Sequence, residues 1–129
     1  MTKLSLLALA ALAAASLAAA AQPAYAQSSR PHEEACTSWG FMRDASYTFG
    51  AVNMCEHPVH IWFLPRGEQV TDARVDANTV FSTGVAISEF RGNWIAATCR
   101  EGYEPNTPVT AENWDTILNS NYRCVRRRR

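Results

Sequence analysis

The side chains best suited to coordinate a metal or transfer a proton are the imidazoles of His57 and His60, three residues apart. A zinc or copper site needs two or three such groups directed at one point. Residues three apart on a strand point to opposite faces of a sheet, although a turn at His57 would relax that restriction. The third histidine, His32, falls in a polar segment. A metal-binding protein or small secreted enzyme that uses His57 and His60 is therefore the alternative function.

The other residue patterns favour a protein without a catalytic site or cofactor. There is no G-x-S-x-G motif around a serine, which would indicate an esterase-type nucleophile. The sequence Asp76-Ala77-Asn78 begins like a calcium-binding loop, but the glycine and terminal glutamate of that loop do not follow at the required spacing. We therefore expect no metal and no cofactor.

The four cysteines, Cys36, Cys55, Cys99 and Cys124, predict two disulfides. An even number of cysteines in a short exported chain is typical of a disulfide framework, and four cysteines allow three pairings. The pairing of near neighbours, Cys36 with Cys55 and Cys99 with Cys124, is the one we favour. Each loop of that size contributes about 3 kcal/mol in the chain-entropy description.

The N-terminus has the features of a secretory signal peptide covering residues 1–26. A basic start is followed by an unbroken run of Leu, Ala and Ser over residues 4–21 and then by Ala24-Tyr25-Ala26. Small residues in this arrangement predict cleavage after Ala26 and export to the bacterial periplasm or medium. The other interpretation is a transmembrane anchor, for which the run is long enough. After cleavage we expect no membrane-spanning segment.

The chain after residue 26 divides into a flexible arm (27–35), a single disulfide-stapled domain (36–125) and a basic tail (126–129). It contains no lysine, and the tail consists of Arg126, Arg127, Arg128 and Arg129. Without them, seven arginines stand against twelve carboxylates, so the neutral total conceals an acidic body with a basic end. We expect the tail to leave the domain and to remain solvated.

Residues 59–64 predict the central strand of a sheet, because large apolar side chains occupy both alternating faces. Residues 46–55 predict a strand that pairs with it as an antiparallel hairpin around Pro58. Residues 85–90 and 94–99 predict a second hairpin. Residues 69–78 are expected to be irregular and residues 102–108 to form a loop.

One short helix is predicted near the C-terminus. Ala111, Trp114, Ile117 and Leu118 share a helical face, and Thr110 is a candidate N-cap. The fold class that follows is mainly β, a small antiparallel sheet of four to six strands arranged as a sandwich or partly open barrel. One C-terminal helix and two disulfides complete it.

The spacing of Asn53, Cys55, Trp62, Trp94 and Cys99 is similar to that in the opening sheet of thaumatin-like proteins. The resemblance covers less than half of the chain, and the cysteine-rich remainder of that family is absent. No functional residue is transferred from it.

The function expected from these observations is a small exported binding protein without a catalytic site. Its partner would be another protein or an anionic envelope component, and an inhibitor of a secreted hydrolase is one variety. The expected binding surface comprises His60, Trp62 and Arg126, Arg127, Arg128 and Arg129, because exposed aromatic rings and guanidinium groups are common in binding sites. We expect no nucleic-acid partner.

Overall fold

The computed structural model describes residues 29–43, 47–86, 88 and 92–128. All strand pairs in this part of the chain are antiparallel. The first sheet has the order β1-β2-β5 and contains β1 (Thr37–Phe41), β2 (Thr48–Asn53) and β5 (Val80–Ala86). The second has the order β4-β3-β6 and contains β4 (Thr71–Val75), β3 (Val59–Pro65) and β6 (Trp94–Arg100). A two-stranded ribbon joins β7 (Tyr103–Pro105) to β8 (Cys124–Arg126).

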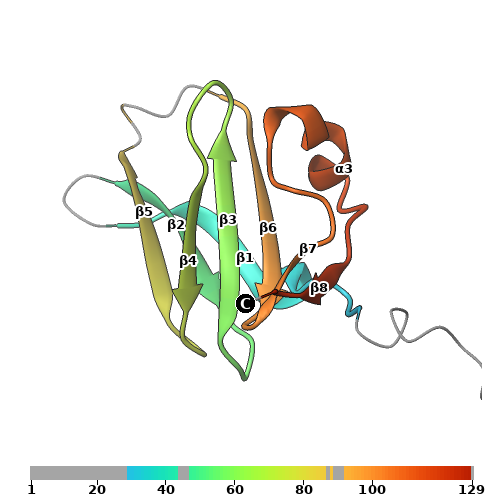
Figure 1. Ribbon diagram of the computed structural model, residues 1–129. Coiled ribbons are helices and arrows are strands. Elements are labelled where there is room, and N and C mark those ends of the chain that lie inside the picture. The colour runs from blue at the N-terminus through green and yellow to red at the C-terminus, as the bar shows by residue number, and fades with distance from the viewer. Residues whose placement is uncertain (1–28, 44–46, 87, 89–91, 129) are drawn as a thin grey trace, which may run out of the picture.

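The two three-stranded sheets pack face to face as a sandwich, with β1 and β2 behind β3 in Figure 1. Alternating side chains from both sheets meet between them, as the period of two requires. One cluster contains Ala51 of β2 with Val59 and Ile61 of β3, and the neighbouring cluster contains Phe49 and Phe63. The predicted fold class is therefore confirmed as a sandwich, with more strands than expected.

The outer face of the second sheet is covered in part by the C-terminal segment, which forms a third layer beside β6 (Figure 1). Trp62 and Leu64 of β3 belong to the same core cluster as Ile117 of helix α3 (Trp114–Leu118). All of residues 59–64 are consequently buried. The prediction of a central strand covered on both faces is confirmed.

Both predicted disulfides are present, Cys36–Cys55 and Cys99–Cys124. The first joins the 3-10 turn η1 (Glu34–Cys36), which precedes β1, to the chain just after β2. The second joins β6 to β8 and so holds the C-terminal layer on the sandwich. The described part of the chain contains no free cysteine.

The hairpin expected between residues 46–55 and 59–64 is wrong, because β2 and β3 belong to different sheets. The chain crosses from one sheet to the other through the turn at Glu56-His57-Pro58. The buried Asn53 holds this crossing: its Nδ2 donates to the carbonyls of His57, Val75 and Asp76 at 3.0–3.1 Å. Its Oδ1 accepts from the Cys55 N–H at 2.9 Å. Two strands with apolar inner faces thus pack face to face.

The second expected hairpin is also wrong, since β5 pairs with β2 whereas β6 pairs with β3. The segment joining them again connects the two sheets. Part of the segment between residues 85–90 and 94–99, including Arg91, lies outside the described residues. Side chains alternate along β6, with Ala96 facing the first sheet and Ile95 and Ala97 facing the C-terminal layer.

Two segments without a clear strand pattern are nevertheless strands. Residues 71–75, within a stretch expected to be irregular, form β4 at the edge of the second sheet. Residues 103–105, within an expected loop, form β7. The C-terminal strand runs from Cys124 to Arg126, so it begins at the disulfide and includes the first arginine of the basic run. Edge strands need few apolar residues, which explains the weak signal.

The predicted helix is a 3-10 turn, η2 (Ala111–Asn113), that continues into α3. Thr110 precedes it in an extended conformation, but its side chain does not cap a backbone N–H, and its hydroxyl instead accepts from Asn113 Nδ2 at 3.3 Å. Ile117 is buried, Trp114 is half-buried and Leu118 is 56 % exposed. Ile117 is therefore the residue that anchors the helix.

The segment before Cys36 contacts the domain. Arg30 and Cys124 exchange two backbone hydrogen bonds of 2.7 and 2.8 Å, and the Glu33 N–H donates to the Thr98 carbonyl at 2.9 Å. These contacts place residues from the expected arm beside β8. In the described ranges, no helix has both the length and the apolar character needed to cross a membrane.

Candidate functional site

His60, Trp62 and Arg127, three residues of the expected binding surface, lie together on the outer face of β3. His60 and Trp62 are two residues apart, so their side chains project on the same side, with ring centroids 4.6 Å apart. His60 Nε2 is 2.8 Å from Oδ1 of Asp72 on the neighbouring strand β4. Both rings are largely buried, because the C-terminal segment lies over them.

The contact with Asp72 assigns the proton of the imidazole. A carboxylate only accepts hydrogen bonds, so His60 Nε2 carries the hydrogen. Arg127 Nη2 lies 3.4 Å from the same nitrogen. Because this nitrogen carries a hydrogen, it has no free lone pair to accept a hydrogen bond from Arg127. Arg127 is held instead by the Trp62 ring, whose centroid is 5.5 Å from Cζ, and by its backbone N–H, which donates to the Gly102 carbonyl at 2.9 Å.

Arg126 precedes Arg127 in an extended strand, so its side chain projects to the other side. It pairs with Tyr103 across the β7–β8 ribbon. Cζ of Arg30, which is paired with Cys124 of the same strand, lies 5.2 Å from the Tyr103 ring centroid. The hydrogen bond from Arg30 and the positive charges of Arg30 and Arg126 lower the pKa of the Tyr103 hydroxyl.

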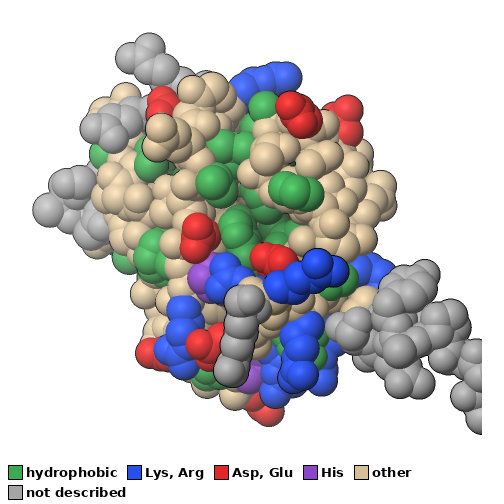
Figure 2. All heavy atoms as spheres, in the orientation of Figure 1, with side chains coloured by type: hydrophobic (Ala, Val, Ile, Leu, Met, Phe, Trp, Pro, Cys, Tyr) green, Lys and Arg blue, Asp and Glu red, His purple; other side chains and the backbone are tan. Residues whose placement is uncertain are grey.

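None of these arginines forms an ion pair with a carboxylate of the described residues. Within the described ranges, ion pairs of arginine with carboxylates are made by Arg74 alone, with Asp76 and with Glu101. Figure 2 shows several basic side chains, with acidic side chains among them, at the end of the molecule where β7 and β8 lie, below an apolar area. We call the surface formed by Arg30, Tyr103 and Arg126 the arginine face.

An open groove lies at the C-terminal end of β3. It has a volume of about 320 Å³ and lies between the end of β3 and the start of the C-terminal helical segment. Arg66 covers the Trp114 ring at its rim, with Cζ 5.4 Å from the ring centroid. Its apolar lining includes Leu64, Val70, Val109 and Trp114.

His57 and His60 do not converge on one point. His57 Nε2 is 3.1 Å from Glu33 Oε1, whereas His60 bonds to Asp72. In the described part of the chain, one group of three ligand side chains has its donor atoms close together: Glu33, Cys36 and Cys55, within 4.8 Å. Its two sulfurs form a disulfide, so they are not free to bind a metal in this state.

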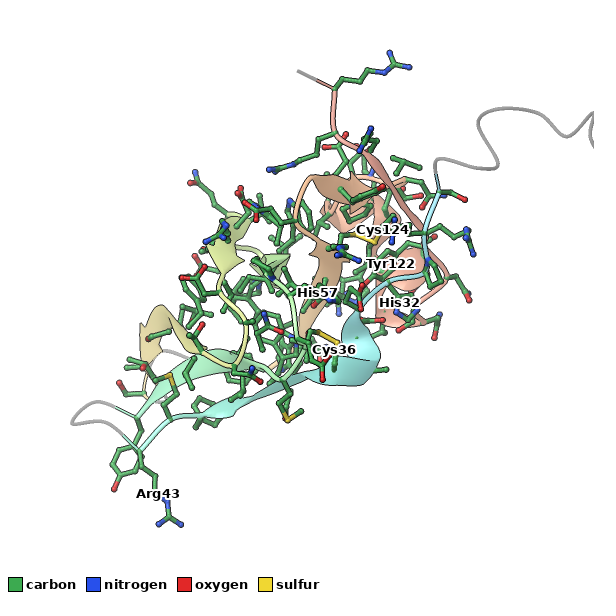
Figure 3. All side chains as sticks on the ribbon, turned by 90° about the horizontal axis from the view of Figure 1, so that it is seen from below. His32, Cys36, Arg43, His57, Tyr122 and Cys124 are labelled. Atoms are coloured by element: carbon green, nitrogen blue, oxygen red, sulfur yellow. A yellow bond between two sulfur atoms is a disulfide. The ribbon has the colours of Figure 1, made fainter. Side chains whose placement is uncertain are left out.

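His32 has a structural role beside the C-terminal layer, where Figure 3 shows it next to Tyr122. The centroids of the two rings are 4.9 Å apart. His32 Nδ1 is 3.3 Å from Glu34 Oε2, close enough for an ion pair but not oriented for a hydrogen bond. The buried Tyr122 hydroxyl accepts from the Thr98 N–H at 2.9 Å, and burial raises the pKa of this tyrosine.

Sequence reasoning missed Asp72, Tyr103 and Arg30. No local pattern marks them, because they reach the surface residues only through the pairing of β4 with β3 and of β8 with β7 and Arg30. Arg126 and Arg127 were identified, but as part of a free tail, whereas both lie on the domain. Arg128 is exposed, and Arg129 lies outside the described residues.

The chain matches no protein-family model, no curated protein and no solved structure. The similarity in layout to thaumatin-like proteins therefore depends on the residues quoted above alone.

Proposed function

We propose that this protein is an exported, non-catalytic binding protein whose partner is a phosphate-bearing anionic component of the cell envelope. The observation that carries the proposal is the arginine face, in which Arg30 and Arg126 flank the Tyr103 hydroxyl. Among the described residues, neither arginine forms an ion pair with a carboxylate. A guanidinium group presents paired N–H donors that match two oxygens of a phosphate.

The arginine face is held in place before any ligand arrives. The Cys99–Cys124 disulfide joins β8 to β6, and the backbone of Arg127 is bonded to Gly102. Groups that are already ordered lose less conformational entropy on binding than a free tail does. Each arginine near an anionic surface contributes about 1 kcal/mol, so the two arginines of this face give reversible association.

Export is supported by the N-terminal sequence and by the cysteines. Residues 1–26 have the pattern of a cleaved signal peptide, and two disulfides are typical of proteins from oxidising compartments. Phosphate-bearing lipids and polymers are abundant anions of a bacterial envelope, so the compartment and the charge favour the same partner.

The test is co-sedimentation of the chain 27–129 with vesicles, in three arms. We expect binding to phosphatidylglycerol vesicles that weakens as salt is raised from low to physiological concentration, because salt screens exposed charges. Vesicles of phosphatidylcholine alone should not bind. Soluble polyphosphate, added as a competitor, distinguishes binding to phosphate groups from binding to the lipid surface. Competition indicates recognition of phosphate groups, and absence of competition indicates recognition of the lipid surface. Equal binding to both kinds of vesicle would overturn the proposal.

A further inference from the structure

The Cys36–Cys55 disulfide is surrounded by two further side chains that can bind metals. Glu33 Oε2 is 3.6 Å from Cys36 Sγ, and Glu33 Oε1 is 3.1 Å from His57 Nε2. The donor atoms of Glu33, Cys36 and Cys55 lie within 4.8 Å of one another. Two sulfurs and a carboxylate thus meet at one place, and the His57 imidazole contacts the same carboxylate through its other oxygen.

The fold brings these residues together from two segments. Glu33 precedes the single turn η1 and Cys36 is its last residue, whereas Cys55 and His57 belong to the crossing from the first sheet to the second. The Asn53 amide holds that crossing through the His57 carbonyl. The Glu33 N–H holds the other segment through the Thr98 carbonyl. The two segments are therefore fixed by bonds other than the disulfide.

We infer that reduction of this disulfide creates a zinc site whose ligands are Cys36, Cys55, Glu33 and His57. In the first step a dithiol reductant transfers two electrons and two protons to the disulfide; the S–S bond breaks, two thiols form and the dithiol becomes a disulfide. In the second step Zn²⁺ binds both sulfurs as thiolates, and two protons are released to solvent. The imidazole nitrogen and the carboxylate complete a four-coordinate site.

The ligand set and the spacing suit zinc. Zinc in proteins is commonly tetrahedral with cysteine, histidine and carboxylate ligands, and a Zn–S bond of about 2.3 Å places two bound sulfurs about 3.8 Å apart. The sulfurs must therefore separate once the bond is broken. Cys36 is half-buried next to the exposed Ala35, so its side chain has room to move, while Cys55 stays in the core.

The second disulfide provides a control inside the same molecule. Cys99 and Cys124 are both fully buried in an apolar cluster, where the Thr98 carbonyl lies 3.7 Å from Cys124 Sγ. A dithiol therefore reaches Cys36 before it reaches Cys99 or Cys124, because exchange requires access to a sulfur. Partial reduction should open the first disulfide and leave the second closed.

The test uses the chain 27–129 and Co²⁺ as a spectroscopic substitute for zinc, with a phosphine reductant that opens the disulfide without competing for metal. The reduced protein should show thiolate-to-cobalt charge-transfer absorption that saturates at one equivalent and disappears when Zn²⁺ is added. The oxidised protein should show none. The Cys99→Ser/Cys124→Ser variant should retain the signal, and the Cys36→Ser/Cys55→Ser variant should lose it.

Two variants that retain all four cysteines keep the test decisive if a disulfide variant fails to fold. His57→Ala and Glu33→Gln should each weaken metal binding by roughly tenfold or more, since the loss of a direct ligand costs at least as much as the loss of a supporting hydrogen bond. The inference is overturned if the reduced protein gives no cobalt signal, or if it stays unfolded with zinc. It is also overturned if both variants bind as tightly as the native chain.

Discussion

The Arg127 guanidinium lies over the indole ring of Trp62, with 5.5 Å between Cζ and the ring centroid. This contact attaches the C-terminal arginine run to the central strand of the second sheet. Because neighbouring residues of an extended strand alternate in direction, it also directs Arg126 toward Tyr103 and Arg30. A run that resembles a free tail in the sequence is thereby converted into part of an ordered surface.

The Trp62–Arg127 contact should be measurable as a coupling free energy. In a double-mutant cycle with Trp62→Leu and Arg127→Gln, we expect the two changes to be coupled by about 0.5–1 kcal/mol, the range of an exposed cation–π contact. Urea unfolding of the four proteins gives this number. Additive effects of the two substitutions would show that Arg127 is not held by the ring.

Helix α3 should depend more on Ile117 than on Trp114. Ile117 is 1 % exposed, whereas Trp114 is half-buried and its ring faces Arg66. Ile117→Ala should lower the free energy of unfolding by about 2–5 kcal/mol, because it leaves a cavity in the core. Trp114→Ala should cost less than Ile117→Ala in the same urea titration. The reverse order would mean that the indole ring of Trp114 anchors the helix.

Strands of the sandwich could be predicted from the sequence where their faces carry a clear apolar pattern. Residues 59–64 were identified as a central strand because both of their faces are apolar. The choice of partner strand could not be predicted, since it depends on the crossing at Glu56-His57-Pro58, where the Asn53 amide binds three carbonyl groups. An isolated asparagine in a sequence gives no indication of such a role.

The candidate site, too, could be predicted from the sequence only in part. His60 and Trp62 were identifiable because aromatic side chains share one face of a strand. Tyr103 and Arg30 were not, because they join the site through the pairing of short edge strands that lack an apolar pattern. Local spacing therefore identified the side chains on β3, and only the tertiary structure shows which charged groups surround them.

Asn53→Asp should destabilise the protein strongly, although the two side chains have nearly the same shape. Asn53 Nδ2 donates to three carbonyls at 3.0–3.1 Å, and the side chain is fully buried. A carboxylate has no hydrogen to donate and would face these oxygens uncompensated, which costs more than an ordinary lost hydrogen bond of about 1–3 kcal/mol. The melting temperature should fall further than in Asn119→Asp, a change at an exposed site whose amide binds one carbonyl. Similar losses in the two variants would contradict this role.

Stability should decline in alkali because of Tyr122. Burial raises the pKa of its hydroxyl, so above about pH 10 the unfolded chain loses this proton while the folded chain retains it. The unfolded state then binds fewer protons, and the free energy of unfolding falls by up to about 1.4 kcal/mol per pH unit. Tyr122→Phe should flatten this decline in urea titrations between about pH 9 and 11.

Tyr103→Phe is the control for that titration, because its pKa shifts in the opposite direction. The hydrogen bond from Arg30 lowers the pKa of Tyr103, so its ionised form is favoured in the folded state and adds stability as pH rises. Its removal should make the decline slightly steeper. If Tyr103→Phe instead flattened the curve, Tyr103 and not Tyr122 would be the cause of the loss of stability in alkali.

The most direct test of the proposed function is the affinity of two matched variants for phosphatidylglycerol vesicles. Arg30→Gln/Arg126→Gln removes both guanidinium groups that flank Tyr103, and each is worth about 1 kcal/mol near an anionic surface. We therefore predict that partitioning weakens by roughly 30-fold. Arg43→Gln removes an exposed arginine at the far end of the molecule from Cys124 (Figure 3) and should leave binding nearly unchanged. If the double variant binds as tightly as Arg43→Gln, the arginine face is not the binding site.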